Sequence, residues 1–463
     1  MISRKRLFSG VIPAVVALTI ASPLLAQRRG GRAGQPPQTQ GQAQAPAQKV
    51  SLKFDFGPGK VQDGYTQVLP DTTFTPQRGY GFDLNTKPSA GVDQGGDALT
   101  GDFVTGEQPF YFSAVVPEGT YKVTLTLGDP KGASTTTVKA EQHRLMLEGV
   151  HTDAGKVETK SFMVNTRSTK ISPPIPTNAP GRPEVTLGII EARTNGGLTW
   201  DDKLTLEFLD SKPCVSSVTI ETAENVPTVF VIGDSTVTDQ PGNTTTSWGQ
   251  MLTRFLGPDV AVANYAESGE TMKSSISELR FDKLLSCMKQ GDYLLVQFGH
   301  NDSKSSWPQT YVAADSTYRD YLKVFIGEAR RRGATPVIIS PMERRNNGTT
   351  NSHGGYPDAV AAVAKETGCA FIDLHSLSQK FQQALGENVA VAFNDGTHHS
   401  RYGAYELAKM IAQGIKDNKL DLANHLAPDF TGFDPSKPDK FEDFKVPQSA
   451  GGNTRPPTVL PGS

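Results

Sequence analysis

The sequence predicts an α/β protein built from two successive bodies, an antiparallel β-sandwich and a three-layer α/β/α unit with a parallel sheet. Two patterns along the 463-residue chain indicate this. Up to about residue 224, apolar residues alternate with polar ones, as in strands that bury one face. From residue 226, short and nearly continuous apolar runs alternate with helical stretches, as in parallel sheets buried on both faces.

The first body, residues 49–224, is predicted from three alternating runs, "VSLKFDF", "YKVTLTL" and "LTLEF". Turn signals such as "GPG", "PEG" and "NGG" lie between the runs, and no long helical pattern intervenes. Short strands at this spacing favour an antiparallel sandwich. The side chains expected on the buried faces are Val50, Leu52, Phe54, Phe56, Tyr121, Val123, Leu125, Leu127, Leu204, Leu206 and Phe208.

The second body, residues 226–420, contains five apolar runs that we interpret as parallel strands. They are "PTVFVIGD", "DVAVANYA", "DYLLVQFG", "TPVIISP" and "CAFIDLH". The clearest helical patterns cover residues 310–332, 357–367, 377–385 and 401–416. In such sheets ligands bind beyond the carboxyl ends of the strands, so the residues that follow each run are the candidates for function.

The first 26 residues have the pattern of a secretory signal peptide. Three basic residues stand among the first six, an apolar stretch follows, and "SPLLA" ends at a cleavage position after Ala26. An uncleaved membrane anchor is the alternative, which Gly10, Pro13 and Pro23 disfavour. The sequence therefore predicts a protein exported to the periplasm or the cell exterior, with no membrane partner after cleavage.

Two further segments are predicted to lie outside the folded bodies. Residues 27–48 consist of Gln, Ala, Gly, Pro and other residues without a large apolar side chain, which predicts a flexible linker. Residues 427–463 are rich in Pro, Gly and Asp, which predicts an extended C-terminal tail. We expect this tail to pack on the body through Phe430, Phe433 and Phe441.

Composition excludes several classes of function. The net charge is −2 and the pI is about 6.5, so no general positive field would hold nucleic acid. The three cysteines, Cys214, Cys287 and Cys369, lack the spacing of a zinc site or a disulfide scaffold. Whether Cys287 and Cys369 pair, and whether the chain forms oligomers, stays open at this stage.

Reactive side chains follow the strands of the second body. A serine hydroxyl needs a base, a group that orients the base, and donors for the oxyanion. "GDST" offers Ser235 as nucleophile, and "DGTH" offers His398 as base with Asp395 to orient its imidazole. Gly269 and Asn301 follow two other strands and would supply a backbone N–H and a side-chain amide, with the Ser235 N–H as third donor.

Each of these motifs alone has an ordinary structural interpretation, because Asn-Asp and Asp-Gly are common in turns and helix caps. Their occurrence in order, at successive strand ends of one body, favours a catalytic site. The chain has no G-x-S-x-G elbow, no H-E-x-x-H and no P-loop, which disfavours an α/β-hydrolase, a zincin and a nucleoside triphosphatase.

On these motifs, residues 226–420 resemble the SGNH (GDSL-type) hydrolases and, more narrowly, the rhamnogalacturonan acetylesterase-like carbohydrate esterases. The blocks "GDST", "NYAESGETMKS", "GHND" and "DGTH" match through Ser235, Gly269, Asn301, and Asp395 with His398. The resemblance implies a flavodoxin-like α/β/α fold and a serine esterase that needs no cofactor or metal. One departure is an acidic residue, Glu270, where members often have arginine, which disfavours a polyanionic substrate.

The first body resembles the galactose-binding-like sandwich found before such esterases, through "FDFGPG" and "GYGFDL". That resemblance implies a carbohydrate-binding or purely structural role. Four aromatic residues could stack on sugar or fill the sandwich core, and the sequence does not decide between the two: Tyr80, Phe82, Tyr111 and Phe112. Such sandwiches often hold calcium, but no ligand set is legible.

Other residues near the expected site are weaker candidates. Arg344 and Arg345 follow the fourth strand and could pair with a uronate carboxylate or belong to a solvated loop. His300 either lines the site or holds its loop. Trp248 is interpreted as packing, and the Asp-x-x-His spacing selects His398 rather than its neighbour as the base.

The function predicted is a secreted serine esterase that removes O-acetyl groups from a polysaccharide, with pectic rhamnogalacturonan as the first choice. The same mechanism on acetylated xylan, another glycan or a lipid is the alternative. A non-catalytic glycan-binding protein is the alternative of a different class. Since every candidate catalytic group lies beyond residue 226, the second body is expected to hydrolyse small esters alone.

Overall fold

The computed structural model describes residues 49–92, 97–173, 184–188, 198–242 and 244–449. The segments interpreted as signal peptide (1–26) and linker (27–48) lie outside the described residues, as does the end of the tail from residue 450. The described residues belong to one compact unit that contains both bodies.

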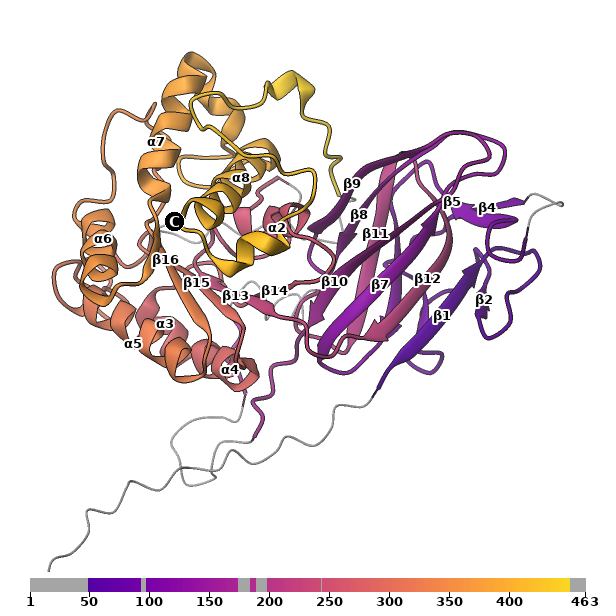
Figure 1. Ribbon diagram of the computed structural model, residues 1–463, viewed down its shortest axis with the longest axis horizontal. Coiled ribbons are helices and arrows are strands. Elements are labelled where there is room, and N and C mark those ends of the chain that lie inside the picture. The colour runs from indigo at the N-terminus through magenta and orange to yellow at the C-terminus, as the bar shows by residue number, and fades with distance from the viewer. Residues whose placement is uncertain (1–48, 93–96, 174–183, 189–197, 243, 450–463) are drawn as a thin grey trace, which may run out of the picture. The chain divides into compact units, whose positions relative to one another are not determined.

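The first body is a sandwich of two sheets, as predicted (Figure 1). Its pairings are antiparallel except that β1 runs parallel to β2. The expected apolar faces meet between the sheets, where Phe54, Val123 and Leu206 are buried. One sheet consists of β10 (Glu158–Thr166), β7 (Gly119–Leu127), β12 (Cys214–Thr222), β1 (Ser51–Phe56) and β2 (Thr66–Val68), with β5 (Asp102–Thr105) and β4 (Ser89–Val92) attached; the other consists of β3 (Tyr80–Asp83), β6 (Phe110–Val115), β11 (Lys203–Lys212), β8 (Ser134–Ala140) and β9 (Arg144–Thr152).

Three of the four aromatic residues that the sequence left undecided are buried, and the fourth is partly buried. Phe82, Tyr111 and Phe112 are at most 1% exposed, and the Tyr80 ring packs against Phe54 at 5.0 Å between ring centroids. Phe82 and Phe112 belong to the core between the sheets, and Tyr80 packs against it. Tyr111 alternates to the other face of β6, where it is buried opposite Glu207 of β11. The three buried rings have no exposed face for a sugar.

The second body contains a parallel sheet whose five strands are the five predicted runs. In spatial order these are β14 (Ala261–Asn264), β13 (Thr228–Gly233), β15 (Tyr293–Gln297), β16 (Thr335–Ile339) and β17 (Ala370–Ile372). In chain order this is the sequence 2-1-3-4-5, the flavodoxin-like arrangement. The order reverses at β13, so the residues after β13, β14 and β15 meet at the switch point where such sheets bind ligands.

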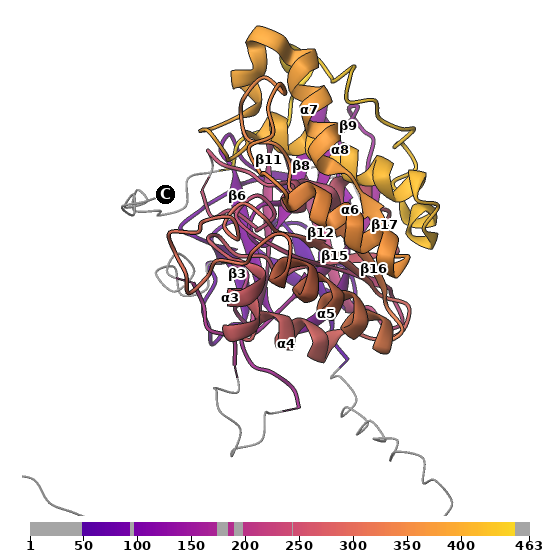
Figure 2. The same ribbon diagram turned by 90° about the vertical axis from the view of Figure 1, so that its left-hand side faces the viewer.

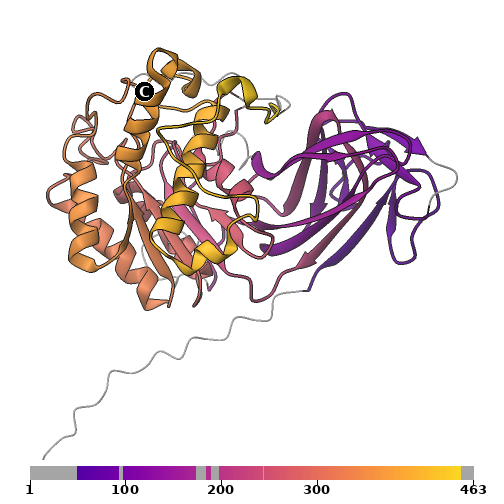
Figure 3. The same cartoon turned by 45° about the horizontal axis from the view of Figure 1, so that its top comes forward.

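Helices cover both faces of this sheet and complete the three layers (Figures 2 and 3). One face packs on α2 (Trp248–Leu252), α7 (Leu374–Leu385) and α8 (Arg401–Asp417). The other packs on α3 (Met272–Ser277), α4 (Arg280–Cys287), α5 (Thr317–Arg331) and α6 (Tyr356–Thr367). Short 3₁₀ segments are η1 (Thr253–Phe255), η2 (Gly386–Ala392), η3 (Asp421–His425) and η4 (Phe441–Asp443).

The predicted helix over residues 310–332 begins later than expected, at Thr317. The preceding residues close a loop instead, because the Val312 N–H donates to the Asp302 carbonyl at 3.1 Å. The Thr317 hydroxyl also accepts a hydrogen bond from the Ala313 N–H at 3.0 Å. These local bonds replace the helical pattern that periodicity alone predicts.

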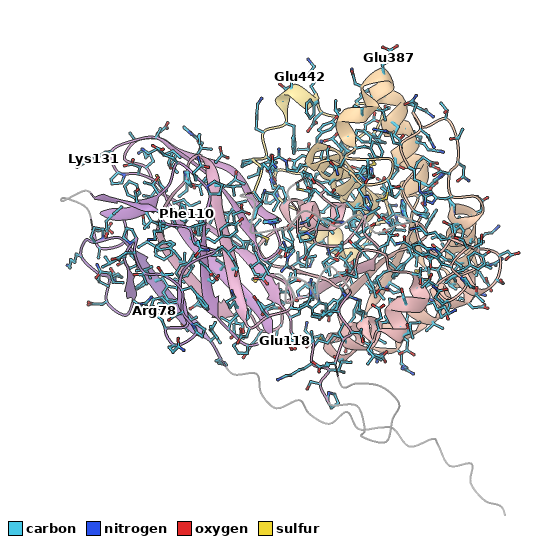
Figure 4. All side chains as sticks on the ribbon, turned by 180° about the vertical axis from the view of Figure 1, so that it is seen from behind. Arg78, Phe110, Glu118, Lys131, Glu387 and Glu442 are labelled. Atoms are coloured by element: carbon cyan, nitrogen blue, oxygen red, sulfur yellow. The ribbon has the colours of Figure 1, made fainter. Side chains whose placement is uncertain are left out.

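The sandwich contributes side chains to both cores of the second body. Leu145 lies in the core beneath α2 and α8, and Trp200 lies in the core on the opposite face of the sheet. The Thr253 hydroxyl donates to the Leu145 carbonyl at 2.7 Å. Glu118, labelled in Figure 4, accepts a hydrogen bond from Lys283 of α4 at 2.8 Å. The two bodies therefore share a buried boundary.

The described part of the tail packs as expected through Phe430 and Phe433, which lie against the core. Phe441 is 46% exposed, but its ring contacts that of the buried Tyr402 at 5.5 Å between centroids. Phe444, which was not predicted, also packs against the core. Farther along, the Pro447 carbonyl accepts a hydrogen bond from Lys139 of the sandwich at 2.9 Å.

The structure answers the question of cysteine pairing that the sequence left open. Cys287 and Cys369 are both free thiols, so they do not form a disulfide. Within the described ranges, no helix combines the length and the apolar character needed to cross a bilayer.

Candidate active site

The loop after β13 carries Ser235 in a tight turn. The Val237 and Thr238 N–H groups both donate to the Asp234 carbonyl at 3.0 Å, which turns the chain back on itself. The Gln240 amide donates to the Ser235 carbonyl at 2.5 Å. Ser235 is thus held at the carboxyl end of the central strand with its side chain 9% exposed.

Ser235, His398 and Asp395 form one hydrogen-bonded chain, although 163 residues separate the serine from the histidine. His398 Nε2 lies 2.9 Å from Ser235 Oγ, and His398 Nδ1 lies 2.7 Å from Asp395 Oδ2. The loop that carries Asp395 and His398 is anchored beside the serine loop, because the Thr246 N–H donates to the His399 carbonyl at 3.0 Å.

Asp395 is arranged to stay ionised. Its burial acts to raise its pKa, but hydrogen bonds from the His398 N–H and ring and from the Thr397 N–H outweigh this, so the pKa of Asp395 is lowered. A carboxylate at Nδ1 places the proton on that nitrogen and leaves Nε2 free to accept a proton from the serine. His399, by contrast, is buried against Phe393, and burial lowers its pKa to about 3.

The three candidate oxyanion donors have uncommitted N–H groups. Among the described residues, the Ser235 and Gly269 N–H groups have no hydrogen-bond acceptor. Asn301 uses one side-chain hydrogen to donate to the Glu270 carbonyl at 3.0 Å, which leaves the other available. Gly269 has a φ of +87°, a backbone conformation that favours glycine.

Asp302 is a residue that sequence reasoning missed. It is fully buried and accepts hydrogen bonds from the Gly299 and Met272 N–H groups, both at 3.0 Å. It thereby fastens the loop of Asn301 to the start of α3, just after Gly269. Burial raises its pKa to about 7, although these backbone bonds act in the opposite direction. Its position next to Asn301 in "GHND" was the only signal in the sequence.

Glu270 does not present a charge to the substrate, contrary to what its position in the second block suggests. Its side chain is 3% exposed and lies 3.6 Å from Arg280 Nε, and it accepts a hydrogen bond from the Ser274 hydroxyl at 2.8 Å. Burial raises its pKa well above the usual range, and contact with Glu278 adds to this. Because the Glu270 side chain is buried, its presence does not disfavour a polyanionic substrate.

The three weaker candidates for substrate binding, His300, Arg344 and Arg345, differ in their burial and in their contacts. His300 is buried with Nδ1 3.3 Å from Oδ2 of Asp234, the residue that precedes Ser235 in the chain. The Arg344 guanidinium donates to the His300 carbonyl at 3.0 Å and to the Ser352 carbonyl at 3.1 Å, so it joins two loops. Arg345 is exposed, and its N–H donates to the Gly396 carbonyl at 3.0 Å, beside Asp395.

The sandwich braces the serine loop through Asp239, whose side chain is 1% exposed. Arg167 Nη2 lies 3.4 Å from Asp239 Oδ2, and Arg144 Nε lies 3.6 Å from the same oxygen. Asn264, at the end of β14, donates to Asp239 Oδ1 at 2.8 Å. Trp248 is fully buried and donates to Gln297 at 2.7 Å, in keeping with the packing role predicted for it.

Among the described residues, no group of three or more histidine, cysteine, aspartate or glutamate side chains is placed to hold a metal ion. The site combines a serine that is hydrogen-bonded to a histidine–aspartate pair with three candidate oxyanion donors at the edge of a flavodoxin-like sheet. This combination defines a serine-dependent acyl hydrolase.

Comparison with known proteins gives the family. Residues 231–404 match the GDSL-like lipase/acylhydrolase family, and residues 52–164 match the galactose-binding-like domain of the β-agarase/YxiM esterase type. The chain belongs to the GDSL-like lipase/acylhydrolase family and is a carboxylic ester hydrolase.

Several relatives come from Bacillus subtilis, and two of them match different shares of this chain. The rhamnogalacturonan acetylesterase RhgT is 36% identical over 220 residues, which are 43% of this chain and 93% of the relative. The esterase YxiM is 24% identical over 386 residues, covering 80% of this chain and 92% of the relative. The crystal structure of YxiM aligns with 80% of this chain and 99% of its own, with 22% identity and a TM-score of 0.42.

Proposed function

We propose that this protein is an exported carbohydrate acetylesterase that removes O-acetyl groups from pectic rhamnogalacturonan. The observation that carries the chemistry is the hydrogen-bonded chain from Ser235 through His398 to Asp395. Ser235 attacks the acetyl carbonyl while His398 takes its proton. The N–H groups of Ser235 and Gly269 and the Asn301 amide stabilise the oxyanion, the sugar hydroxyl leaves with the proton from His398, and water then releases acetate.

The choice of polysaccharide is supported by the relative whose printed name is rhamnogalacturonan acetylesterase, which this chain matches over 93% of that relative's length. The experiment that tests it is acetate release from a panel of acetylated rhamnogalacturonan, homogalacturonan and xylan. We expect the highest kcat/KM on rhamnogalacturonan. A higher value on xylan would favour the alternative substrate, and release from none would contradict the proposal.

Export is proposed from the first 26 residues, whose basic start, apolar stretch and cleavage position have the pattern of a signal peptide. Amino-terminal sequencing of the protein recovered outside the cytoplasm tests this. A mature chain that begins at Gln27 is expected, and retention of Met1 would contradict cleavage.

The Asn301→Ala substitution tests the oxyanion donors. Losing one side-chain donor in such a site typically costs about 10²–10³ in kcat, because the hydrogen bond is made to charge that develops in the transition state. We expect a loss of that size in acetate release, with KM nearly unchanged. A rise confined to KM would instead make the Asn301 amide a ground-state binding group.

The Arg345→Gln substitution tests recognition of a charged glycan. Because the Arg345 side chain is exposed, we expect only about a twofold to fivefold loss of kcat/KM on acetylated rhamnogalacturonan, and added salt should reduce it. The matched variant is Arg344→Gln, which removes hydrogen bonds that join two loops and should impair charged and neutral substrates alike. Equal losses on both substrates for Arg345→Gln would contradict its pairing with a uronate.

A further inference from the structure

The loop that follows Asn301 carries an exposed aromatic side chain, that of Trp307. Of the three tryptophans in the chain, Trp200 and Trp248 are 6% and 0% exposed, whereas Trp307 is 37% exposed. The loop is closed at its base, because the Val312 N–H donates to the Asp302 carbonyl at 3.1 Å. Trp307 therefore stands on a short closed loop rooted at the residue next to Asn301.

Hydrogen bonds hold this loop next to the two segments that carry Gly269 and Asn301, which are two of the candidate oxyanion donors. The Lys304 N–H donates to the Asn301 carbonyl at 3.0 Å, and the Trp307 N–H donates to the Lys304 carbonyl at 2.9 Å. From the other side, Lys273 of α3 donates to the Pro308 carbonyl at 3.4 Å. Since α3 begins three residues after Gly269, the loop lies between the two segments that supply Gly269 and Asn301.

The ammonium group of Lys304 lies over the indole ring of Trp307. Lys304 Nζ lies 4.6 Å from the centre of the Trp307 ring. Within the described residues, no carboxylate lies within ion-pair distance of Lys304, so its charge is not neutralised by a neighbour. Burial lowers the pKa of Lys304 and the nearby charge of Arg344 lowers it further, while Asp234 acts in the opposite direction.

We propose that Trp307 and Lys304 form a subsite that binds a uronate-containing oligosaccharide next to the esterified sugar. This rests on the proposed function and adds the residues that would recognise the polymer. The exposed indole offers a large, flat, apolar face for the C–H face of a pyranose ring. The ammonium beside it offers a charged partner for the uronate carboxylate.

Binding of a product-like ligand tests the subsite without requiring turnover. De-esterified rhamnogalacturonan oligosaccharides would be titrated into the full chain by calorimetry, with intrinsic tryptophan fluorescence recorded in parallel. We expect Trp307→Ala to weaken binding roughly fivefold to tenfold and to abolish the fluorescence change, because the other two tryptophans are buried. We expect Lys304→Gln to weaken binding at low salt and to differ less from the unaltered protein at high salt.

Two control variants use similar residues away from the site. Lys53→Gln removes a lysine that also lies over an aromatic ring, that of Tyr65, at 5.9 Å in the sandwich. Val324→Ala removes an exposed apolar side chain of α5, which is 47% exposed. Both should bind the oligosaccharide as the unaltered protein does. Circular dichroism and thermal unfolding would show that every variant is folded.

The outcomes separate this inference from the proposed function. If the unaltered protein binds the oligosaccharide and folded Trp307→Ala and Lys304→Gln bind it equally well, the subsite is wrong while the substrate assignment stands. If the unaltered protein binds neutral xylo-oligosaccharides but no uronate oligosaccharide, both the substrate assignment and the role of Lys304 are wrong. Weakened binding in both variants, with both controls unchanged, supports the subsite.

Discussion

Replacing Ser235 with alanine is expected to lower kcat for acetate release by roughly 10⁶-fold, the scale on which loss of a triad nucleophile acts. No other described side chain stands at hydrogen-bond distance from His398 Nε2, so no second hydroxyl can take over the attack. Stability should change little, within about 0.5 kcal/mol, because His398 is the only hydrogen-bond partner of the Ser235 hydroxyl among the described residues.

The measurement is the initial rate of acetate release, together with labelling by a fluorophosphonate probe. The unaltered protein should be labelled and Ser235→Ala should not. Ser303→Ala is the matched control, since Ser303 lies two residues after Asn301. Within the part of the chain that the structure describes, its hydroxyl makes one hydrogen bond, of 3.4 Å, to the His300 carbonyl. Residual activity above a few per cent would place the nucleophile elsewhere. Absence of labelling in the unaltered protein would favour a non-catalytic glycan-binding protein.

Removing the sandwich is expected to inactivate the second body even toward a small acetyl ester. The sequence alone led to the opposite expectation, because every candidate catalytic group lies beyond residue 226. The contacts change this expectation: a chain beginning at residue 225 would expose the core surfaces that Leu145 and Trp200 cover. It would also leave Asp239 buried without Arg144 and Arg167. Removing partners of a buried charge costs about 3–5 kcal/mol.

The substitution Arg144→Leu keeps this prediction testable if the shortened chain does not fold. Arg144 is 2% exposed and donates to the Val262 and Asn165 carbonyls, each at 2.9 Å, besides facing Asp239. We expect the free energy of unfolding to fall by about 3 kcal/mol and kcat on a small ester to fall with it. Arg78→Leu, at an exposed arginine of the same sandwich labelled in Figure 4, should change neither quantity. A shortened chain as active as the full one would contradict the bracing role.

Much of the fold followed from local pattern. The five apolar runs became the five parallel strands, because a strand covered on both faces has to be apolar along most of its length. Three alternating runs became β1, β7 and β11 of the sandwich for the corresponding reason. The predicted start of α5 was wrong, because the Val312 N–H donates to the Asp302 carbonyl and closes a loop there. The spacing of apolar residues carries no information about such a contact.

The candidate site was predictable to the extent that its chemistry is carried by short motifs. Ser235, Asp395 and His398 were chosen because serine chemistry needs a base and an orienting acid, and the structure brings these three side chains into one hydrogen-bonded chain. Asp302 and Trp307 were missed. Their significance depends on which loops lie next to each other, and no residue type or spacing reveals that.

The sequence by itself determined the two strand patterns, the parallel sheet and the choice of Ser235, His398 and Asp395 as the candidate catalytic residues. These properties depend on side-chain polarity and on chemistry within a few neighbouring residues. Only the tertiary structure decided that Glu270 turns inward to Arg280, that Arg344 joins two loops rather than facing solvent, and that sandwich arginines brace Asp239. Each of these depends on a contact between residues that folding brings together. A charged side chain that is buried in such a contact has to face a partner within the protein and is not available to a ligand.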